Sequence, residues 1–130
     1  MKSFDILVVD DVPDCRAVLA AMLGAQGYAV RTADCGPAAL AAIDERRPDA
    51  VLLDVMMPGM SGLEVLERVR ATPVTASLPV ILLTARSSDD DMVSGYQMGA
   101  DYYIPKPCTV RQLMHGLSIV LGRGDETQAA

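Results

Sequence analysis

Five short apolar runs, separated by stretches with helical periodicity, constrain the fold of this sequence more than any other feature. The runs are rich in Val, Ile, Leu and Tyr and have the length of strands. They cover residues 5–10, 28–33, 50–54, 79–84 and 102–105. Because strand and helix alternate five times, we predict a parallel sheet with helices on both faces, joined by right-handed crossovers.

The residue pattern inside each element agrees with this architecture. Residues 6–9, 51–53 and 80–83 are apolar without alternation, as strands covered on both faces must be. Apolar residues also recur at helical spacing in four stretches: Val18, Leu19, Met22 and Leu23; Leu40 and Ile43; Leu63, Leu66 and Val69; Leu113, Leu117, Val120 and Leu121. A fourth helix, at about residues 88–98, is less apolar and is expected to be more exposed.

Helix punctuation supports the same boundaries. Pro13 can occupy a first helical turn, and Thr109 can cap the last helix. Gly27 and Gly99 follow the first and fourth predicted helices. We therefore expect one domain over residues 1–122, followed by a flexible tail or linker stub at residues 123–130.

Composition excludes several classes of partner. The formal net charge of -6 and the pI near 4.5 argue against nucleic acid, whose binding depends on clustered Lys and Arg. The apolar stretch at the N-terminus is too short for a signal peptide or a membrane span, so a cytoplasmic location without membrane contact is expected. Cys15, Cys35 and Cys108 form no paired metal-ligand motif and are expected to be reduced core residues.

Polar side chains collect where the predicted strands end. The first run ends in Asp10 and Asp11, the third in Asp54 and the fourth in Thr84, while the last leads to Lys106. In an open α/β sheet, ligands bind outside the carboxyl ends of the strands. Three carboxylates, one hydroxyl and one ammonium are therefore expected at one edge of the sheet.

The chemistry of this group points to a metal and a phosphoryl group. Three converging carboxylates repel one another unless a cation neutralises them, and all-oxygen ligation is what Mg²⁺ prefers. A bound dication would shield a phosphoryl donor as it approaches a carboxylate nucleophile. Lys106 and Thr84 would then contact phosphoryl oxygens.

Each residue taken alone also has a simpler explanation. Asp10 and Asp11, taken alone, are as compatible with a plain strand-to-helix turn with a helix cap as with a functional site. An Asp that closes a strand, such as Asp54, is more often a cap or turn residue than a nucleophile. Lys106, which stands before a proline just past a buried strand, is harder to explain in this way, although most lysines are solvated surface groups. Only the joint occurrence of these residues at the right strand ends is specific.

Four segments resemble the receiver domains of two-component response regulators, in matching order and spacing. They are LVVDD at residues 7–11, LLDVMMPGMSGLEVL at 52–66, LLTAR at 82–86 and GADYYIPKP at 99–107. The resemblance implies a flavodoxin-like sheet with strand order 2-1-3-4-5 and five helices. It also implies a signalling module, not an enzyme, that accepts a phosphoryl group from a histidine kinase or a histidine phosphotransfer protein.

The resemblance also implies roles for individual residues of the metal site. Asp54 is similar to the phosphorylated aspartate, and Asp11 with Asp54 to the direct Mg²⁺ ligands. Asp10 would hold the metal through water, and the carbonyl of Met56 would complete the ligand set. Met56 and Arg86 flank the site in the family pattern, so both are expected to tune hydrolysis of the aspartyl phosphate.

Other implied roles concern phosphate binding and switching. Thr84 and Tyr103 occupy the positions of the family's switch pair, and Lys106 that of its phosphate-binding lysine. The bond between Lys106 and Pro107 is expected to be cis. The chain departs from the pattern at Cys108, where an aromatic residue is common, and at Pro105, which removes one donor from the last strand.

A partner surface is expected over the fourth helix, fifth strand and fifth helix. Receivers of the winged-helix branch form a charge-paired dimer there, and Asp91 and Arg111 are plausible counterparts. Met92 and Tyr102 stand where that branch has a basic and an acidic residue. With Tyr96 they make the face more apolar, which favours a different protein partner. The alternative is that these are scattered surface apolar residues.

Two rival functions lack their required residues. A phosphatase of the haloacid-dehalogenase type usually needs a second Asp two residues after the nucleophile, where this chain has Met56. A nucleotide-binding module would need a GxGxxG turn or a GxxxxGK loop, and Gly59 and Gly62 are better explained as turn residues. A scaffold that cannot be phosphorylated would have lost one of the site residues. The sequence leaves open whether the chain is a single-domain regulator or part of a longer one.

Overall fold

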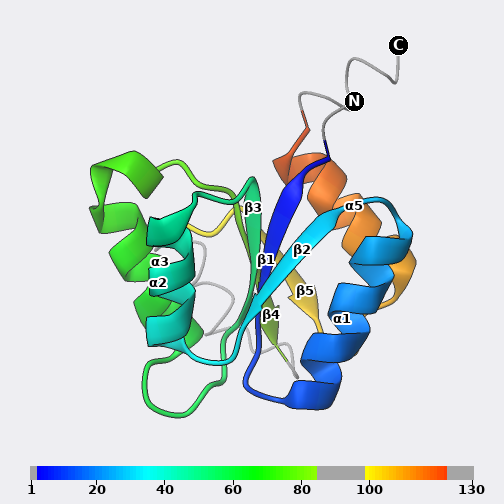
Figure 1. The fold of residues 1–130 in the computed structure, drawn as a ribbon, viewed down its shortest axis with the longest axis horizontal. Coiled ribbons are helices and arrows are strands. Elements are labelled where there is room, and N and C mark those ends of the chain that lie inside the picture. Colours follow the sequence, from blue (N-terminus) through cyan, green and yellow to red (C-terminus); the bar gives the residue numbers. More distant parts are fainter. Residues whose placement is uncertain (1–2, 85–98, 123–130) are drawn as a thin grey trace.

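A computed structural model describes residues 3–84 and 99–122 of the chain. Its centre is a parallel five-stranded sheet in the order β2-β1-β3-β4-β5, which confirms the predicted fold class and strand order (Figure 1). The strands are β1 (Asp5–Val9), β2 (Ala29–Ala33), β3 (Ala50–Asp54), β4 (Val80–Thr84) and β5 (Tyr102–Pro105). Each lies within one residue of its predicted bounds.

Helices cover both faces of the sheet. They are α1 (Pro13–Ala25), α2 (Gly36–Glu45), α3 (Gly62–Ala71) and α5 (Val110–Val120), with a short 3-10 turn, η1 (Pro73–Thr75), after α3. Helices α1 and α5 lie on one face, and α2 and α3 on the other. The predicted fourth helix lies outside the described residues, as does the predicted tail at residues 123–130.

Successive residues of each strand contribute to two separate cores. Leu7 and Val9 of β1 pack with the α2 and α3 side, whereas Ile6 and Val8 pack with the α1 and α5 side. All four side chains have no exposed surface. The lack of alternation in the sequence therefore reflects burial on both faces, as predicted.

The strand register aligns the carboxyl ends of the strands at one edge. Val9 of β1 pairs with Ala33 of β2 and with Leu53 of β3. Thr84, the last residue of β4, pairs with Pro105, the last of β5. Residues that directly follow these positions therefore meet at the same edge, which is the lower end of the sheet in Figure 1.

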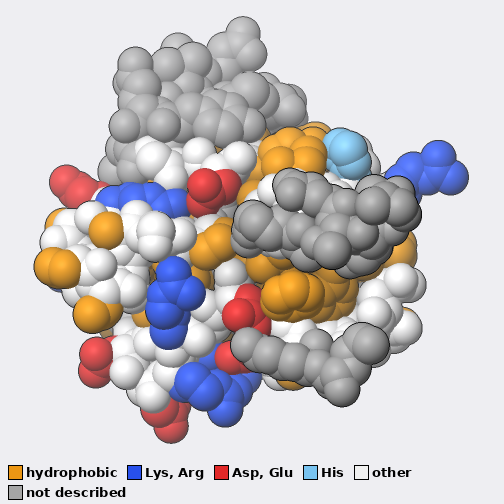
Figure 2. Space-filling model, turned by 90° about the horizontal axis from the view of Figure 1, so that it is seen from above, with side chains coloured by type: hydrophobic (Ala, Val, Ile, Leu, Met, Phe, Trp, Pro, Cys, Tyr) orange, Lys and Arg blue, Asp and Glu red, His pale blue; other side chains and the backbone are white. Residues whose placement is uncertain are grey.

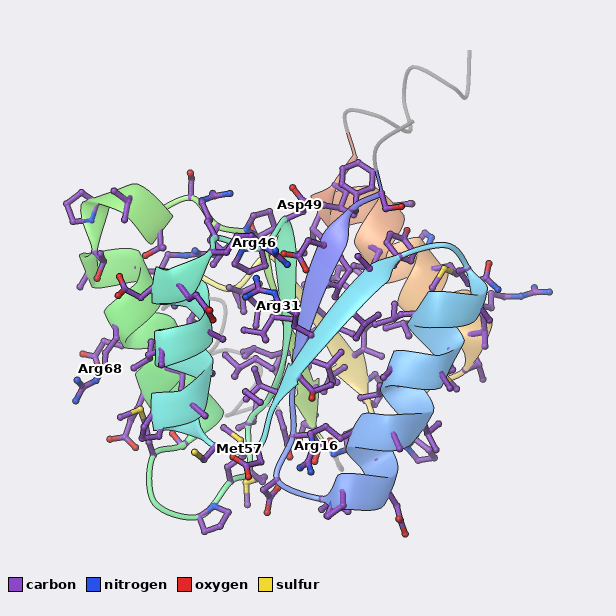
Figure 3. All side chains as sticks on the ribbon, viewed as in Figure 1. Arg16, Arg31, Arg46, Asp49, Met57 and Arg68 are labelled. Carbon is purple, nitrogen blue, oxygen red and sulfur yellow. The ribbon has the colours of Figure 1, made fainter. Side chains whose placement is uncertain are left out.

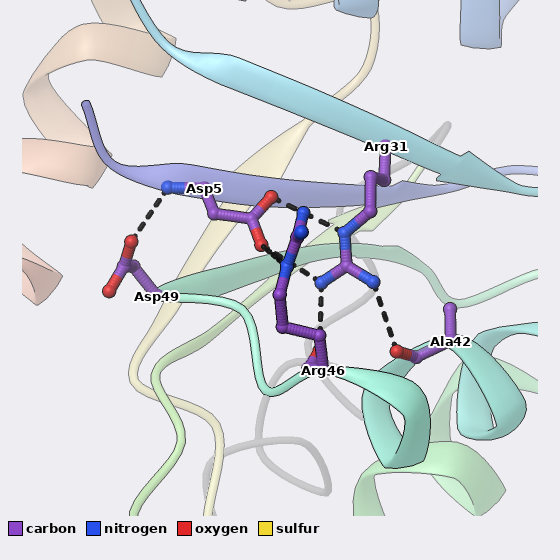
Figure 4. A network of polar contacts seen from close by, with 5 residues as sticks. All are labelled: Asp5, Arg31, Ala42, Arg46 and Asp49. Carbon is purple, nitrogen blue, oxygen red and sulfur yellow. Dashed lines mark hydrogen bonds and ion pairs between the residues drawn. The ribbon is translucent and has the colours of Figure 1, made fainter.

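The opposite edge, at the amino ends of the strands, is held by a polar network (Figure 4). Arg31 contacts an Asp5 carboxylate oxygen at 2.9 Å and donates to the carbonyl of Ala42 at 3.0 Å. The Asp5 amide donates to Asp49 at 2.6 Å, and Arg46 contacts Asp5 at 3.3 Å. These contacts tie β1 and β2 to the end of α2. Figure 2 looks onto this end and shows charged side chains over one part of it and hydrophobic side chains over another.

Two sequence-based expectations about side-chain burial are wrong. Val18, assigned to the apolar face of the first helix, is 53% exposed, because Leu19 and Leu23 are the residues of α1 that face the sheet. Cys15, Cys35 and Cys108 are unpaired as expected but only half-buried. All three lie at or beside the start of a helix, at the margin of the layers, where burial is incomplete.

Helix starts agree with the predicted punctuation. Pro13 is in the first turn of α1, and Thr109 caps α5 with a reciprocal hydrogen-bond pair to Gln112. Pro105 lies on the edge strand β5, where a missing donor is tolerated. Among the residues that the structure describes, no helix combines the length and apolar character needed to cross a bilayer.

Candidate functional site

Three carboxylates converge at the carboxyl ends of β1 and β3. One oxygen from each of Asp10, Asp11 and Asp54 lies within 4.8 Å of the others. Asp10 has no exposed surface, and Asp54 is 3% exposed. Because β1 and β3 are neighbours in the sheet, residues that are 44 positions apart in the chain meet here. The structure thus brings together the three predicted acidic residues.

Asp10 is held in the turn from β1 into α1 by hydrogen bonds of its backbone and its side chain. Its amide donates to the carbonyl of Ala33 at 3.2 Å, and its Oδ1 accepts the amide of Val12 at 2.9 Å. The N-cap of α1 is Val12, which makes no side-chain cap. Neither Asp10 nor Asp11 is therefore the cap of this helix, although Asp10 does stabilise the turn.

Asp54 ends β3 and faces the same space. Its Oδ1 accepts the amide of Met56 at 3.1 Å. A Cβ atom on Gly62 would overlap the carbonyl of Asp54, so only glycine lets α3 begin against this strand end. The sequence pattern predicts Gly62 only as a turn residue. Its close approach to Asp54 is the more specific reason.

Lys106 reaches the cluster from the end of β5. Its Nζ lies 2.8 Å from Asp10 Oδ2 and 3.6 Å from Asp54 Oδ2, and its side chain is 16% exposed. Burial alone would lower the pKa of Lys106. The hydrogen bond to Asp10 and the charge of Asp54 outweigh burial and raise this pKa above its ordinary value. The Lys106–Pro107 peptide bond is cis, as expected.

The surroundings of Asp54 raise the pKa of its carboxyl, whereas a simple ion pair with Lys106 would lower it. Burial raises the pKa of its carboxyl from 3.8 to about 6, and the charge of Asp10 adds to this effect. Lys106 opposes the rise but does not cancel it. Ionised Asp54 is therefore destabilised in the metal-free protein, and a cation that binds it gains from neutralising that charge.

The donor set fits a hard divalent cation. Three carboxylates face one another, and the Lys106 ammonium balances one of their charges. The triad is typical of the Mg²⁺ site of receiver domains. Carboxylate oxygens of Asp11 and Asp54, with Asp10 acting through water, would match what Mg²⁺ requires. The residues present therefore fit the ion that the sequence predicts.

The two predicted switch residues lie on adjacent strands. Thr84 ends β4 and is 2% exposed, and Tyr103 lies in β5 with its side chain buried in the core on the side of α2 and α3. The neighbouring Tyr102 points to the other face. There its ring meets that of His115 edge-on, with centroids 6.2 Å apart, and packs beside Gly116.

Of the remaining predicted site residues, some lie in the part of the chain that the structure describes and others lie outside it. Met56 is 65% exposed at the rim of the site, and Arg111 is exposed on α5. The other predicted residues lie outside the described part of the chain. They are Arg86, Asp91, Met92 and Tyr96.

Two features near the site were not predicted from the sequence. Arg16 donates from Nη1 to the carbonyl of Asp10 at 2.8 Å. An apolar groove of about 450 Å³, here called the α1 groove, adjoins Lys106. It is lined by Asp14, Cys15, Val18, Leu19, Met22, Lys106, Pro107 and Cys108. Val18, which is unexpectedly exposed, lines this groove. Helical periodicity alone could not reveal the groove.

Comparison with known proteins gives a consistent result. The family profile of the response regulator receiver domain matches residues 6–118. The sensory transduction protein RegX3 of Mycobacterium tuberculosis is 42% identical over 121 residues, which are 93% of this chain and 52% of RegX3. The phosphate regulon transcriptional regulatory protein PhoB of Pseudomonas aeruginosa is 41% identical over 91% of this chain and 52% of PhoB. The chain thus spans about half the length of these relatives.

Solved structures agree with the fold. A chain from Chloroflexus aurantiacus superposes with a TM-score of 0.90 and 35% identity, over 93% of this chain and 99% of that one. The chemotaxis protein CheY4 of Vibrio cholerae superposes with a TM-score of 0.87 and 32% identity, over 92% of this chain and 99% of CheY4.

Proposed function

The chain belongs to the response regulator receiver family, and we propose that Asp54 is the residue on which it accepts a phosphoryl group. The family makes it a signalling module and implies a histidine kinase as partner. The observation that carries the proposal is the convergence of three carboxylates within 4.8 Å, with the Lys106 ammonium 2.8 Å from one of them.

In the proposed transfer, a carboxylate oxygen of Asp54 attacks phosphorus and the bond from phosphorus to the donor's histidine nitrogen breaks. The phosphoryl group then rests on Asp54 as an aspartyl phosphate, and the donor keeps its imidazole. Asp11, Asp54 and the Met56 carbonyl would hold Mg²⁺ directly and Asp10 through water, and the ion would supply positive charge beside the reacting groups. Asp54 is suited to attack because it is buried at a fixed strand end.

Lys106 and Thr84 act on the phosphoryl group in this proposal. The ammonium moves from Asp10 to a phosphoryl oxygen, which is a short displacement because it already lies 3.6 Å from Asp54. The Thr84 hydroxyl, at the end of the adjacent strand β4, donates to another oxygen. Tyr103, whose strand pairs with β4, changes position as the switch partner.

The protein that donates the phosphoryl group docks, in this proposal, on the α1 groove. A donor must bring its phosphohistidine to Asp54 and therefore covers surface beside the site. The groove shares Lys106 with the site and offers an apolar lining in which Val18 is 53% exposed. A helical donor surface with apolar side chains fits such a groove.

Output is proposed to occur through the fourth helix, β5 and α5, by contact with a downstream protein. The described part of this face supports an apolar contact. Tyr102 packs against α5 beside Gly116 and makes an edge-on contact with His115, while staying partly exposed, and Arg111 is exposed at the start of α5. A new phosphoryl charge of roughly -1.5 to -2 biases such a two-state surface.

Intact-mass measurement tests the phosphoacceptor directly. Incubation with acetyl phosphate and Mg²⁺ should add one acid-labile phosphoryl group to the wild-type chain. Asp54→Asn should abolish the addition, and a chelator should suppress it. Asp44→Asn, an equivalent change at an exposed position of α2, should label like wild type. Labelling that persists in Asp54→Asn would overturn the proposal.

A further inference from the structure

Arg16 occupies an unusual position for a side chain that the proposed chemistry does not use. Its backbone amide donates to the carbonyl of Val12 at 3.0 Å, and its Nη1 donates to the carbonyl of Asp10 at 2.8 Å. One residue of α1 therefore holds both ends of the turn that leaves β1. Figure 3 shows Arg16 at the lower end of the sheet, where the strands have their carboxyl ends.

The carbonyl that Arg16 holds belongs to the peptide plane between Asp10 and Asp11. Because a peptide unit is planar, fixing its oxygen also fixes the direction in which the chain enters Asp11. The other contacts of the turn act elsewhere: the Asp10 amide bonds to Ala33, its Oδ2 bonds to Lys106, and its Oδ1 accepts the Val12 amide, which belongs to the peptide after Asp11. Among these contacts, the one from Arg16 acts on the peptide between Asp10 and Asp11.

We propose that Arg16 is a positioning residue of the magnesium site, which sets the placement of Asp11 by holding the Asp10 carbonyl. The inference rests on the proposed magnesium site and adds to it a residue that touches neither the metal nor the phosphoryl group. Residues that orient metal ligands from outside the ligand set influence affinity strongly, and their loss lowers it about 10- to 100-fold.

A purely electrostatic role for Arg16 predicts the opposite change in Mg²⁺ affinity. If Arg16 is only a positive charge near a cation site, it repels Mg²⁺, and removing its charge must tighten binding. If Arg16 positions Asp11, the same removal must weaken binding although repulsion has fallen. The direction of the change therefore distinguishes the two roles.

Calorimetric titration of the full chain with magnesium chloride is the test. Arg16→Gln should weaken Mg²⁺ affinity about tenfold, and Arg16→Lys, which keeps a cationic donor, should recover part of the loss. Arg68→Gln removes the same charge from an exposed position of α3 and should leave affinity unchanged. Equal or tighter binding by Arg16→Gln would overturn the inference. Absence of binding by the wild-type chain would instead refute the magnesium site itself.

A second readout needs no metal and guards against a variant that merely unfolds. In the metal-free chain, amide hydrogen exchange at Val12 reports the bond from its amide to Asp10 Oδ1. Arg16→Gln should speed exchange at Val12 severalfold while core amides such as that of Leu52 keep wild-type protection. Unchanged exchange at Val12 would show that the turn holds its geometry without Arg16, and would also overturn the inference.

Discussion

Lys106 pairs with Asp10, whose carboxylate oxygen lies 2.8 Å from the lysine ammonium, although the two residues are 96 positions apart in the chain. The ammonium is farther from Asp54, at 3.6 Å. The lysine therefore donates a hydrogen bond to Asp10 and not to the proposed nucleophile, Asp54, with which it forms only a longer ion pair. This arrangement gives Lys106 and the three carboxylates distinct effects on metal binding.

Removing the Lys106 charge should strengthen Mg²⁺ binding, because the ammonium competes with the ion for Asp10. Asp11→Asn should instead weaken binding by about tenfold or more, since it removes a proposed ligand. Calorimetric Mg²⁺ titrations of Lys106→Met and Asp11→Asn measure both effects. Both variants should first be shown to be folded by circular dichroism. Equal loss of affinity in the two variants would contradict this division of roles.

Asp54 should make the metal-free protein less stable as pH rises. Its pKa is about 6 in the folded chain and ordinarily 3.8. Below the lower value the carboxyl is protonated in both states. Between the two values the folded state keeps a proton that the unfolded state loses, so the free energy of unfolding falls with pH and then levels off.

Asp54→Asn removes this dependence and should raise the free energy of unfolding near pH 7.5 by up to about 3 kcal/mol, from a shift of about two pKa units. Near pH 3.5 the variant and the wild type should differ little. Urea denaturation with a chelator present measures both. A variant that is less stable than wild type near pH 7.5 would show that ionised Asp54 is stabilised by its surroundings.

A charge introduced into the α1 groove should slow phosphoryl transfer from a protein donor but not from a small-molecule donor. Val18→Asp places a carboxylate on an apolar surface that the donor is proposed to cover, and should slow transfer from a phosphohistidine protein by about tenfold or more. Labelling by acetyl phosphate should be unaffected, because Val18 does not touch the site. Val74→Asp is the matched control, since Val74 is exposed on η1. Equal slowing with both donors would argue against docking in the groove.

Met56 should prolong the phosphorylated state. Its side chain is 65% exposed beside Asp54, and a thioether cannot orient an attacking water as an amide or carboxylate can. Met56→Asn and Met56→Glu should therefore accelerate dephosphorylation, whereas Met56→Leu, which stays apolar, should not. The decay of the phosphorylated species is followed by intact mass. Unchanged decay in Met56→Asn would refute this explanation.

Beryllofluoride, which mimics the phosphoryl group, should perturb the proposed output face without producing a charge-paired dimer. Tyr102 stands where the winged-helix branch has an acidic residue, and it packs on α5 instead of offering a charge. Sedimentation at several salt concentrations measures association. A dimer that depends on beryllofluoride and dissociates as salt rises would show that paired charges still hold this face.

The prediction of burial from sequence was wrong for Val18, because burial depends on the angle of a side chain around its helix. Val18 and Leu19 are adjacent apolar residues of α1, yet one is 53% exposed and the other is buried. Periodicity locates a helix and its approximate apolar face. It does not resolve which of two neighbours at the margin of that face meets the sheet, because this depends on how the helix is rotated against the sheet.

The sequence by itself determined the order of the elements and the strand ends that carry Asp10, Asp54 and Thr84, because uninterrupted apolar runs identify buried parallel strands and their carboxyl ends share one edge. Only the tertiary structure decided that Lys106 bonds to Asp10, and that Arg16 reaches the Asp10 carbonyl. These contacts depend on rotamers and on packing between segments far apart in the chain. Local sequence patterns carry no information about either, since a side chain's partner is chosen among all groups that the fold brings within its reach.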